Sequence, residues 1–165
     1  MIRRSKKPHS AWKGLLAGAV GTIALDVATY VDMALRGRSS SGGPSSMVAT
    51  LASKLHFPLS SQGVGAQDQT AQNRESGLGA LLGYANGLGT GIAYSLLRPQ
   101  QDEVSLPLAG VAVGLAAMAG SDVPLVALKV SDPKTWGVAG WLSDLVPHLI
   151  YGFATVATYE ALSNS

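Results

Sequence analysis

The sequence predicts an all-α polytopic membrane protein with four transmembrane helices. Only 13% of its residues are charged, against about 25% in a typical soluble domain. Four mostly apolar stretches follow one another along the chain, each of about 20 residues or more, which is the length that a helix needs to cross a bilayer. Glycines recur at helical spacing inside these stretches, as they do in helices that pack closely in lipid. The 165 residues are expected to form one domain.

The four expected spans cover residues 11–35, 76–97, 104–128 and 137–162. The second has no charged residue at all. The first could instead be a secretory signal, but it continues to Arg36 without a clear small-x-small cleavage site. The other alternative is a soluble four-helix bundle, whose helices should each have a polar face. The second and third stretches have almost none, which favours the membrane.

The segment between the first two spans, residues 36–75, is rich in Ser, Gly and Gln and is expected to lie outside the membrane. Its middle part, residues 44–55, has apolar residues at helical spacing: Met47, Val48, Leu51 and Leu55. This pattern predicts a short helix on the bilayer surface.

Orientation is predicted from the basic residues that precede the first span, which are Arg3, Arg4, Lys6, Lys7 and Lys13. Cytoplasmic loops carry an excess of Lys and Arg, so this cluster places both termini in the cytoplasm. Over the whole chain the two sides would carry equal numbers of basic residues, and the leading cluster decides because the first helix usually dominates. Trp12, Trp136 and Trp141 fall at the expected span ends, where indole rings favour the headgroup region.

The stretch SGLGALLGYANGLGTG, residues 76–91, could be a phosphate-binding loop or part of a packed helix. A dinucleotide fingerprint needs a buried strand before it, whereas the preceding residues are polar. The glycines instead recur every four residues and so share one helical stripe: Gly79, Gly83, Gly87 and Gly91. The spacing predicts a glycine zipper against another helix, with an unwound ligand-binding segment as the alternative.

A second pattern indicates two parallel helical hairpin repeats. Residues 87–97, GLGTGIAYSLL, align without gaps with residues 152–162, GFATVATYEAL, and share Gly, Thr and Tyr. The tripeptide LAG opens both the first span, at 16–18, and the third, at 108–110. Chance identity between apolar helices is the alternative.

Ionisable side chains inside a bilayer are costly, so each is a functional hypothesis, with structural pairing as the alternative. On the predicted topology one polar layer gathers in the outer half of the spans: Asp26, Asp122, Asp144, His148, Tyr84, Asn86 and Tyr151. Asp144 and His148 are four residues apart, so the carboxylate can orient the imidazole, as in a proton relay or a cation site. Asp32 is expected to pair with Arg36, and Glu160 to be peripheral.

No enzyme is predicted. The chain has no cysteine, no Ser-x-x-Lys or Gly-x-Ser-x-Gly motif, and its three histidines are scattered without a metal-ligand pattern. We therefore expect no cofactor, no metal and no nucleic acid partner. The expected partners are the lipid bilayer and either further copies of the chain or another membrane protein. The sequence favours a structural or accessory membrane component, and the alternative is a proton- or cation-coupled carrier or channel that uses the polar layer.

The last expected span contains SDLVPHLIYGFATVATYEAL, in which an acid, a histidine one turn later, an aromatic residue and a late acid follow one another. This helix resembles the last helix of the YagU-type bacterial inner-membrane proteins. The resemblance covers that helix and the four-span plan. It implies a fold and a location in the bacterial inner membrane, and it implies no activity.

Overall fold

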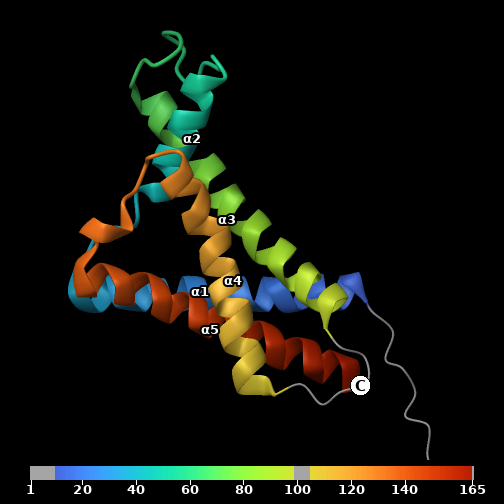
Figure 1. The fold of residues 1–165 in the computed structure, drawn as a ribbon. Coiled ribbons are helices and arrows are strands. Elements are labelled where there is room, and N and C mark those ends of the chain that lie inside the picture. Colours follow the sequence, from blue (N-terminus) through green and yellow to red (C-terminus); the bar gives the residue numbers. More distant parts are fainter. Residues whose placement is uncertain (1–9, 99–104, 165) are drawn as a thin grey trace, which may run out of the picture.

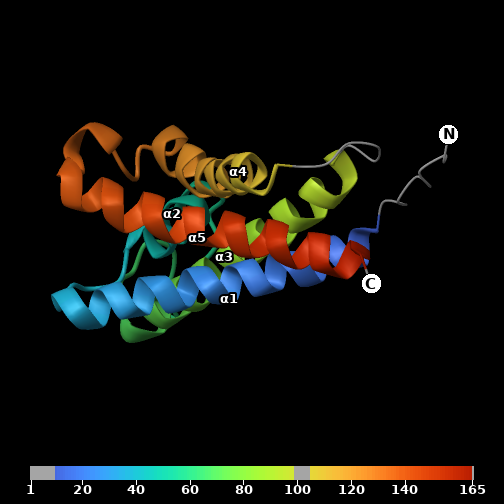
Figure 2. The ribbon, with the colours of Figure 1, turned by 90° about the horizontal axis from the view of Figure 1, so that it is seen from below.

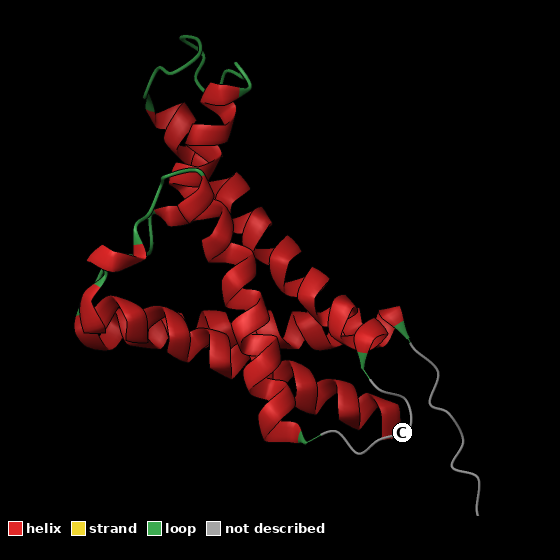
Figure 3. Cartoon of the chain, in the orientation of Figure 1, coloured by secondary structure: helices red, strands yellow, loops and turns green. Residues whose placement is uncertain are grey.

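A computed structural model describes residues 10–98 and 105–164, and within these the chain is helical without a β-strand (Figures 1 and 3). The predicted all-α class is therefore confirmed. The leading cluster of basic residues, apart from Lys13, lies outside the described residues. The elements are α1 (Ala11–Arg36), α2 (Gly43–Lys54), α3 (Gln69–Leu97), α4 (Leu106–Ala127), the short 3-10 helix η1 (Pro133–Thr135) and α5 (Gly137–Asn164).

The helix bounds agree with the expected spans except at the start of α3. This helix begins at Gln69 rather than Ser76, because the Asp68 side chain accepts a hydrogen bond of 2.7 Å from the backbone nitrogen of Ala71. A carboxylate at this position satisfies an otherwise unpaired backbone N–H of the first turn. The first two turns of α3 therefore extend beyond the expected span.

The four long helices do not form a bundle with parallel axes. Helices α1 and α5 lie side by side and run in opposite directions, and α5 lies between α1 and α4 (Figure 2). Helix α3 crosses α1 near the start of α1 and then diverges from it obliquely, as Figure 1 shows. The four-helix bundle expected from the sequence is corrected accordingly.

Helix α2 and the loop after it form a small head on the first turns of α3 (Figure 1). Its core is a cluster of four buried residues, Val48, Ala52, Leu59 and Ala71. The short helix predicted within residues 44–55 is thus present. The buried residues of this helix, Val48 and Ala52, pack against Ala71 in the first turns of α3.

Two helices, α1 and α4, are long and apolar enough to cross a membrane. Only 28% of the apolar window in α1 and 39% of that in α4 is buried within the chain, unlike the core helix of a soluble domain. Helices α3 and α5 do not reach the same hydropathy. The part of α3 that matches the expected span, residues 76–97, has no charged residue, but its glycines, Asn86 and its tyrosines lower the mean hydropathy.

Candidate functional site

The first structural site is the crossing of α1 and α3, which four glycines line. A Cβ atom added to Gly14 would lie 2.6 Å from the carbonyl oxygen of Gly91, and one on Gly18 would lie 2.7 Å from that of Gly87. Such distances leave no room for a side chain, so the two backbones are in direct contact. Ser95 continues the same stripe of α3 and is fully buried against Gly14.

A second crossing of the same kind joins α4 and α5. A Cβ atom on Gly114 would lie 2.6 Å from the carbonyl oxygen of His148, and one on Gly152 would meet the backbone of Gly110 and Gly114. Helices α4 and α5 are therefore also in backbone contact.

The two crossings use residues that the alignment of the two halves matches. Under the sequence alignment, Gly110 corresponds to Gly18 and Gly152 corresponds to Gly87. In the structure Gly18 meets Gly87, and Gly110 meets Gly152. The pairing of α1 with α3 thus recurs as the pairing of α4 with α5, which supports the duplicated hairpin inferred from the sequence.

The stripe predicted on α3 does not act as one continuous surface. Gly87 and Gly91 contact α1, whereas Gly79 lies against Pro44 of α2. Gly83 has no neighbouring atom within 4 Å at its Cβ position. The prediction that all four glycines pack on one helix is therefore wrong for the single chain, because α3 has already diverged from α1 at Gly83.

The predicted polar layer separates into four groups. Tyr84 lies 3.5 Å from Asp26, at the outer limit of a hydrogen bond, on exposed parts of α3 and α1. The Asn86 side chain donates to the carbonyl oxygen of Ala117 at 2.8 Å and so links α3 to α4. Tyr151 is buried and donates to the carbonyl oxygen of Gly87 at 2.6 Å, which links α5 to the first crossing. These contacts hold helices together and do not converge on a common site.

The fourth group, Asp122, Asp144 and His148, is the part of the layer that does converge. The Nδ1 atom of His148 lies 2.8 Å from the carbonyl oxygen of Asp144 and 3.2 Å from its carboxylate, which confirms the predicted pairing. The Asp122 carboxyl of α4 interacts with both of these side chains. The arrangement joins α4 and α5 through two carboxyls and one imidazole.

The hydrogen bonds of this group orient the imidazole ring of His148. A carbonyl oxygen can only accept, so Nδ1 of His148 carries a hydrogen. The Ser121 hydroxyl donates to the carbonyl oxygen of Met118 at 2.8 Å and lies 3.4 Å from Nε2 of His148. Ser121 of α4 is therefore within reach of the second ring nitrogen, on the side of the imidazole away from Asp144. Among the described residues, the Oδ2 atom of Asp144 is buried without a hydrogen-bond partner, so acceptors exceed donors here.

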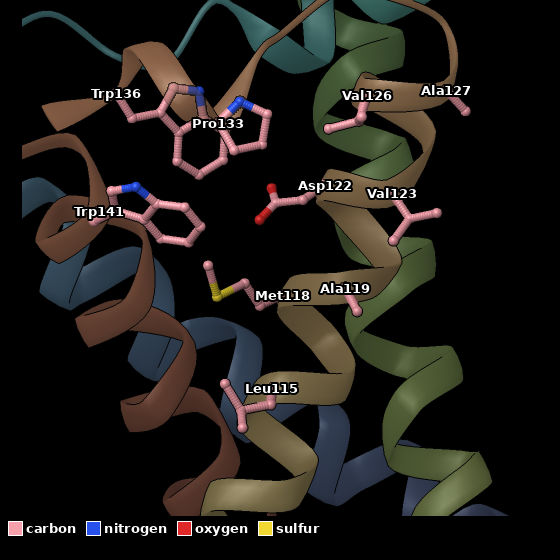
Figure 4. A pocket seen from close by; sticks show the side chains of 10 residues that line it. All are labelled: Leu115, Met118, Ala119, Asp122, Val123, Val126, Ala127, Pro133, Trp136 and Trp141. Atoms are coloured by element: carbon pink, nitrogen blue, oxygen red, sulfur yellow. The ribbon is translucent and has the colours of Figure 1, made fainter.

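A pocket of about 440 Å³ opens beside Asp122, between the carboxyl-terminal half of α4 and the start of α5 (Figure 4). The Asp122 carboxylate points into it, opposite Trp136 and Trp141. The two indole rings contact each other with centroids 5.0 Å apart, and Nε1 of Trp136 donates to the Ser131 hydroxyl at 2.8 Å. The tryptophans expected to anchor a span end thus also form a pocket wall.

Two further groups of ion pairs and hydrogen bonds lie at the ends of the long helices. At the carboxyl end of α1, Asp32 pairs with Arg36 at 2.6 Å, as predicted, and also with Arg38. Arg36 in turn donates to the Ser143 hydroxyl of α5.

At the other end Glu160 of α5 pairs with Arg98, whose side chain is only 7% exposed, and accepts from the Tyr94 hydroxyl at 3.2 Å. The prediction that Glu160 is peripheral is wrong. Its partner is distant in sequence, so helical spacing could not reveal the pair. The sequence contained one indication of this contact, because the alignment of residues 87–97 with 152–162 matches Tyr94 with Tyr159. The rings of these two tyrosines are in edge contact, with centroids 5.4 Å apart.

In the described part of the chain, no group of three or more His, Asp or Glu side chains is arranged to hold a metal ion. No protein-family model, no curated protein and no solved structure matches this chain. Its function has to be inferred from its own residues.

Proposed function

We propose that this chain is a small integral membrane protein whose four long helices cross the bilayer, and that it serves as a structural or accessory membrane component. The observation that supports the proposal is the distribution of side-chain size. The crossings of the long helices are built from small residues, above all Gly14, Gly18, Gly87, Gly114 and Gly152. Helices in lipid associate through such close packing, because the hydrophobic effect cannot drive them together there.

Large apolar side chains cover the outside of all four long helices. Exposed members include Ile23, Val27 and Leu35 on α1; Leu81, Leu82 and Leu97 on α3; Leu108, Leu115 and Val123 on α4; and Val138, Leu142 and Ile150 on α5. A soluble monomer rarely exposes continuous apolar surface of this extent, since water would penalise it. A bilayer accommodates it on every side, and further copies of the chain would cover part of it in a homo-oligomer.

The orientation we propose places both termini in the cytoplasm, in a bacterial inner membrane, as the basic leading residues and the likeness to YagU-type proteins favour. The head formed by α2 would then lie outside. Hydrophilic residues dominate its loop, including Ser60, Ser61 and Asp68, which are joined by hydrogen bonds.

Membrane insertion and topology are tested together. The chain has no cysteine, so single cysteines at Ser5, Ser61, Gln101 and Ser163 need no cysteine-free background. We expect the protein to resist alkaline carbonate extraction and to react with an impermeant maleimide from outside only at position 61. Extraction into the soluble fraction refutes the integral placement, and labelling at position 5 from outside inverts the orientation.

A second candidate function is a proton- or cation-coupled carrier, which the meeting of Asp122, Asp144 and His148 beside an open pocket favours. Ionisable groups that face one another inside a membrane protein are common in ion pathways. Proton and cation flux into proteoliposomes should then be measurable for the wild type and fall in Asp144→Asn and His148→Ala. Absence of flux in the wild type removes this candidate and leaves the structural one.

A further inference from the structure

The pocket beside Asp122 combines an apolar wall with one carboxylate. Its walls come from Leu115, Met118 and Asp122 of α4, from Pro133 and Trp136 before α5, and from Trp141 (Figure 4). The volume of about 440 Å³ falls in the range of small-molecule sites, roughly 300–1,000 Å³. A few polar groups in an apolar pocket usually fix the orientation and type of the ligand.

The ionisable groups beside the pocket include more carboxyls than basic side chains. Asp122 interacts with Asp144 and His148, so two carboxyl groups face one imidazole. The imidazole can pair with only one of the two carboxyls, so the other, when ionised, carries a negative charge without a positive counterpart in this group. Asp144 lies in hydrogen-bonding range of His148, at 3.2 Å, while the Asp122 carboxylate points into the pocket. The pocket is therefore complementary to a positive charge.

The wall opposite Asp122 is aromatic and rigid. Trp136 is held by its hydrogen bond to Ser131, and Trp141 packs on it with an interplanar angle of 52°. The face of an indole ring attracts a cation more strongly than any other protein ring, particularly one that has shed its water. Carboxylate and indoles thus favour the same charge from two sides of the pocket.

The apolar lining decides which cation fits. A small inorganic cation must exchange its water for several oxygen ligands, and the described walls offer one carboxylate. An organic cation with a delocalised or substituted charge needs no such ligands and gains from apolar contact. We propose that this pocket binds a hydrophobic organic cation, with its charge near Asp122 and its apolar groups on Trp136 and Trp141.

A lipid acyl chain is the competing occupant. It matches the apolar walls, but it makes no favourable interaction with a carboxylate, and burying that charge beside it would be costly. The carboxylate therefore discriminates between the two occupants.

Binding is tested by equilibrium dialysis of radiolabelled tetraphenylphosphonium against the purified full chain in detergent, with empty micelles as the blank. Triphenylphosphine oxide, an uncharged compound with similar apolar rings, is the ligand control. We expect saturable binding of the cation, at least tenfold tighter than that of the neutral compound.

Two matched pairs of variants assign the binding to the pocket. Asp122→Asn should weaken binding of the cation at least tenfold, whereas Asp26→Asn, which neutralises a carboxylate on α1 outside the pocket, should leave it unchanged. Trp141→Leu should weaken binding several-fold and Trp12→Leu should not. Trp141 is 43% exposed and Trp12 is 57% exposed, so both tryptophan variants are expected to fold and the second pair decides if Asp122→Asn does not.

Equal affinity for the charged and neutral compounds, or unchanged binding in both Asp122→Asn and Trp141→Leu, overturns the proposal and identifies the pocket as a lipid-filled cavity. The inference rests on the proposed membrane placement only for the surroundings of the pocket. Because binding is measured in detergent without flux or insertion, its failure is distinguishable from failure of the topology experiment.

Discussion

The crossing of α1 and α3 allows a sharp comparison between two glycines of one helix. Gly91 lies in the crossing and Gly83 lies two turns earlier on the same stripe, with no neighbour within 4 Å. We expect Gly91→Ala to destabilise the protein and Gly83→Ala, its matched control, not to do so. Both changes add the same methyl group to the same helix.

The magnitude follows from the geometry. A Cβ atom on Gly91 would meet the carbonyl oxygen of Gly14 first and would lie 2.6 Å from Cα of Gly18, where ordinary contact begins at 3.4 Å, so the helices must separate by at least about 0.8 Å. Neither atom belongs to a flexible side chain that could move aside. Separation of 0.5–1 Å forfeits about a quarter to a half of the dispersion attraction across an interface. Overpacking of this kind costs about 1–3 kcal/mol.

The helix propensity of alanine exceeds that of glycine by about 1 kcal/mol, and both variants gain it. The difference in unfolding free energy between the two variants therefore isolates the packing cost, about 1–3 kcal/mol in favour of Gly83→Ala. Reversible unfolding in mixed micelles of dodecyl maltoside and dodecyl sulfate, followed by far-UV circular dichroism, measures it. Equal unfolding free energies for the two variants would refute the backbone contact at Gly91.

Three other changes test the contacts between helices and the cap of α3. Asn86→Leu removes the hydrogen bond from α3 to α4 and should cost about 0.6–2 kcal/mol in the same unfolding assay, with no loss expected if that bond is absent. Glu160→Gln removes the charge that pairs with the Arg98 side chain and should cost about 1.5–3 kcal/mol, as for a charge-assisted hydrogen bond; an unchanged unfolding free energy would indicate a solvated pair. The hydrogen bond from the backbone N–H of Ala71 holds the pKa of the Asp68 carboxyl below its usual value. The stabilisation that this carboxylate gives the folded state is therefore fully present above about pH 4, and it is lost as the pH falls through the lowered pKa of the folded state. Amide exchange in the first turn of α3, corrected for intrinsic rates, should accelerate over that range in the wild type and not in Asp68→Asn, which keeps an uncharged cap; identical profiles would contradict the assignment.

Local features were readable from the sequence because helix geometry alone determines them. The apolar runs defined four long helices, and α1 and α5 begin at Ala11 and Gly137 as expected. Pairs four residues apart share a helical face whatever the tertiary structure, so Asp32 with Arg36 and Asp144 with His148 could be predicted.

Only the tertiary structure decided which residues of different helices meet. Two helices that cross obliquely stay in contact over a few turns, so of one periodic stripe Gly87 and Gly91 contact α1 while Gly83 does not. Asp26 and Asp122 do not meet, although both sit at a similar depth in the sequence-based topology, because α5 lies between α1 and α4. The sequence determined the helices and their local pairs, since these depend on neighbours along the chain. The crossing points, the Arg98–Glu160 pair and the pocket at Asp122 depend on how the helix axes are arranged in space, which periodicity within a single helix does not specify.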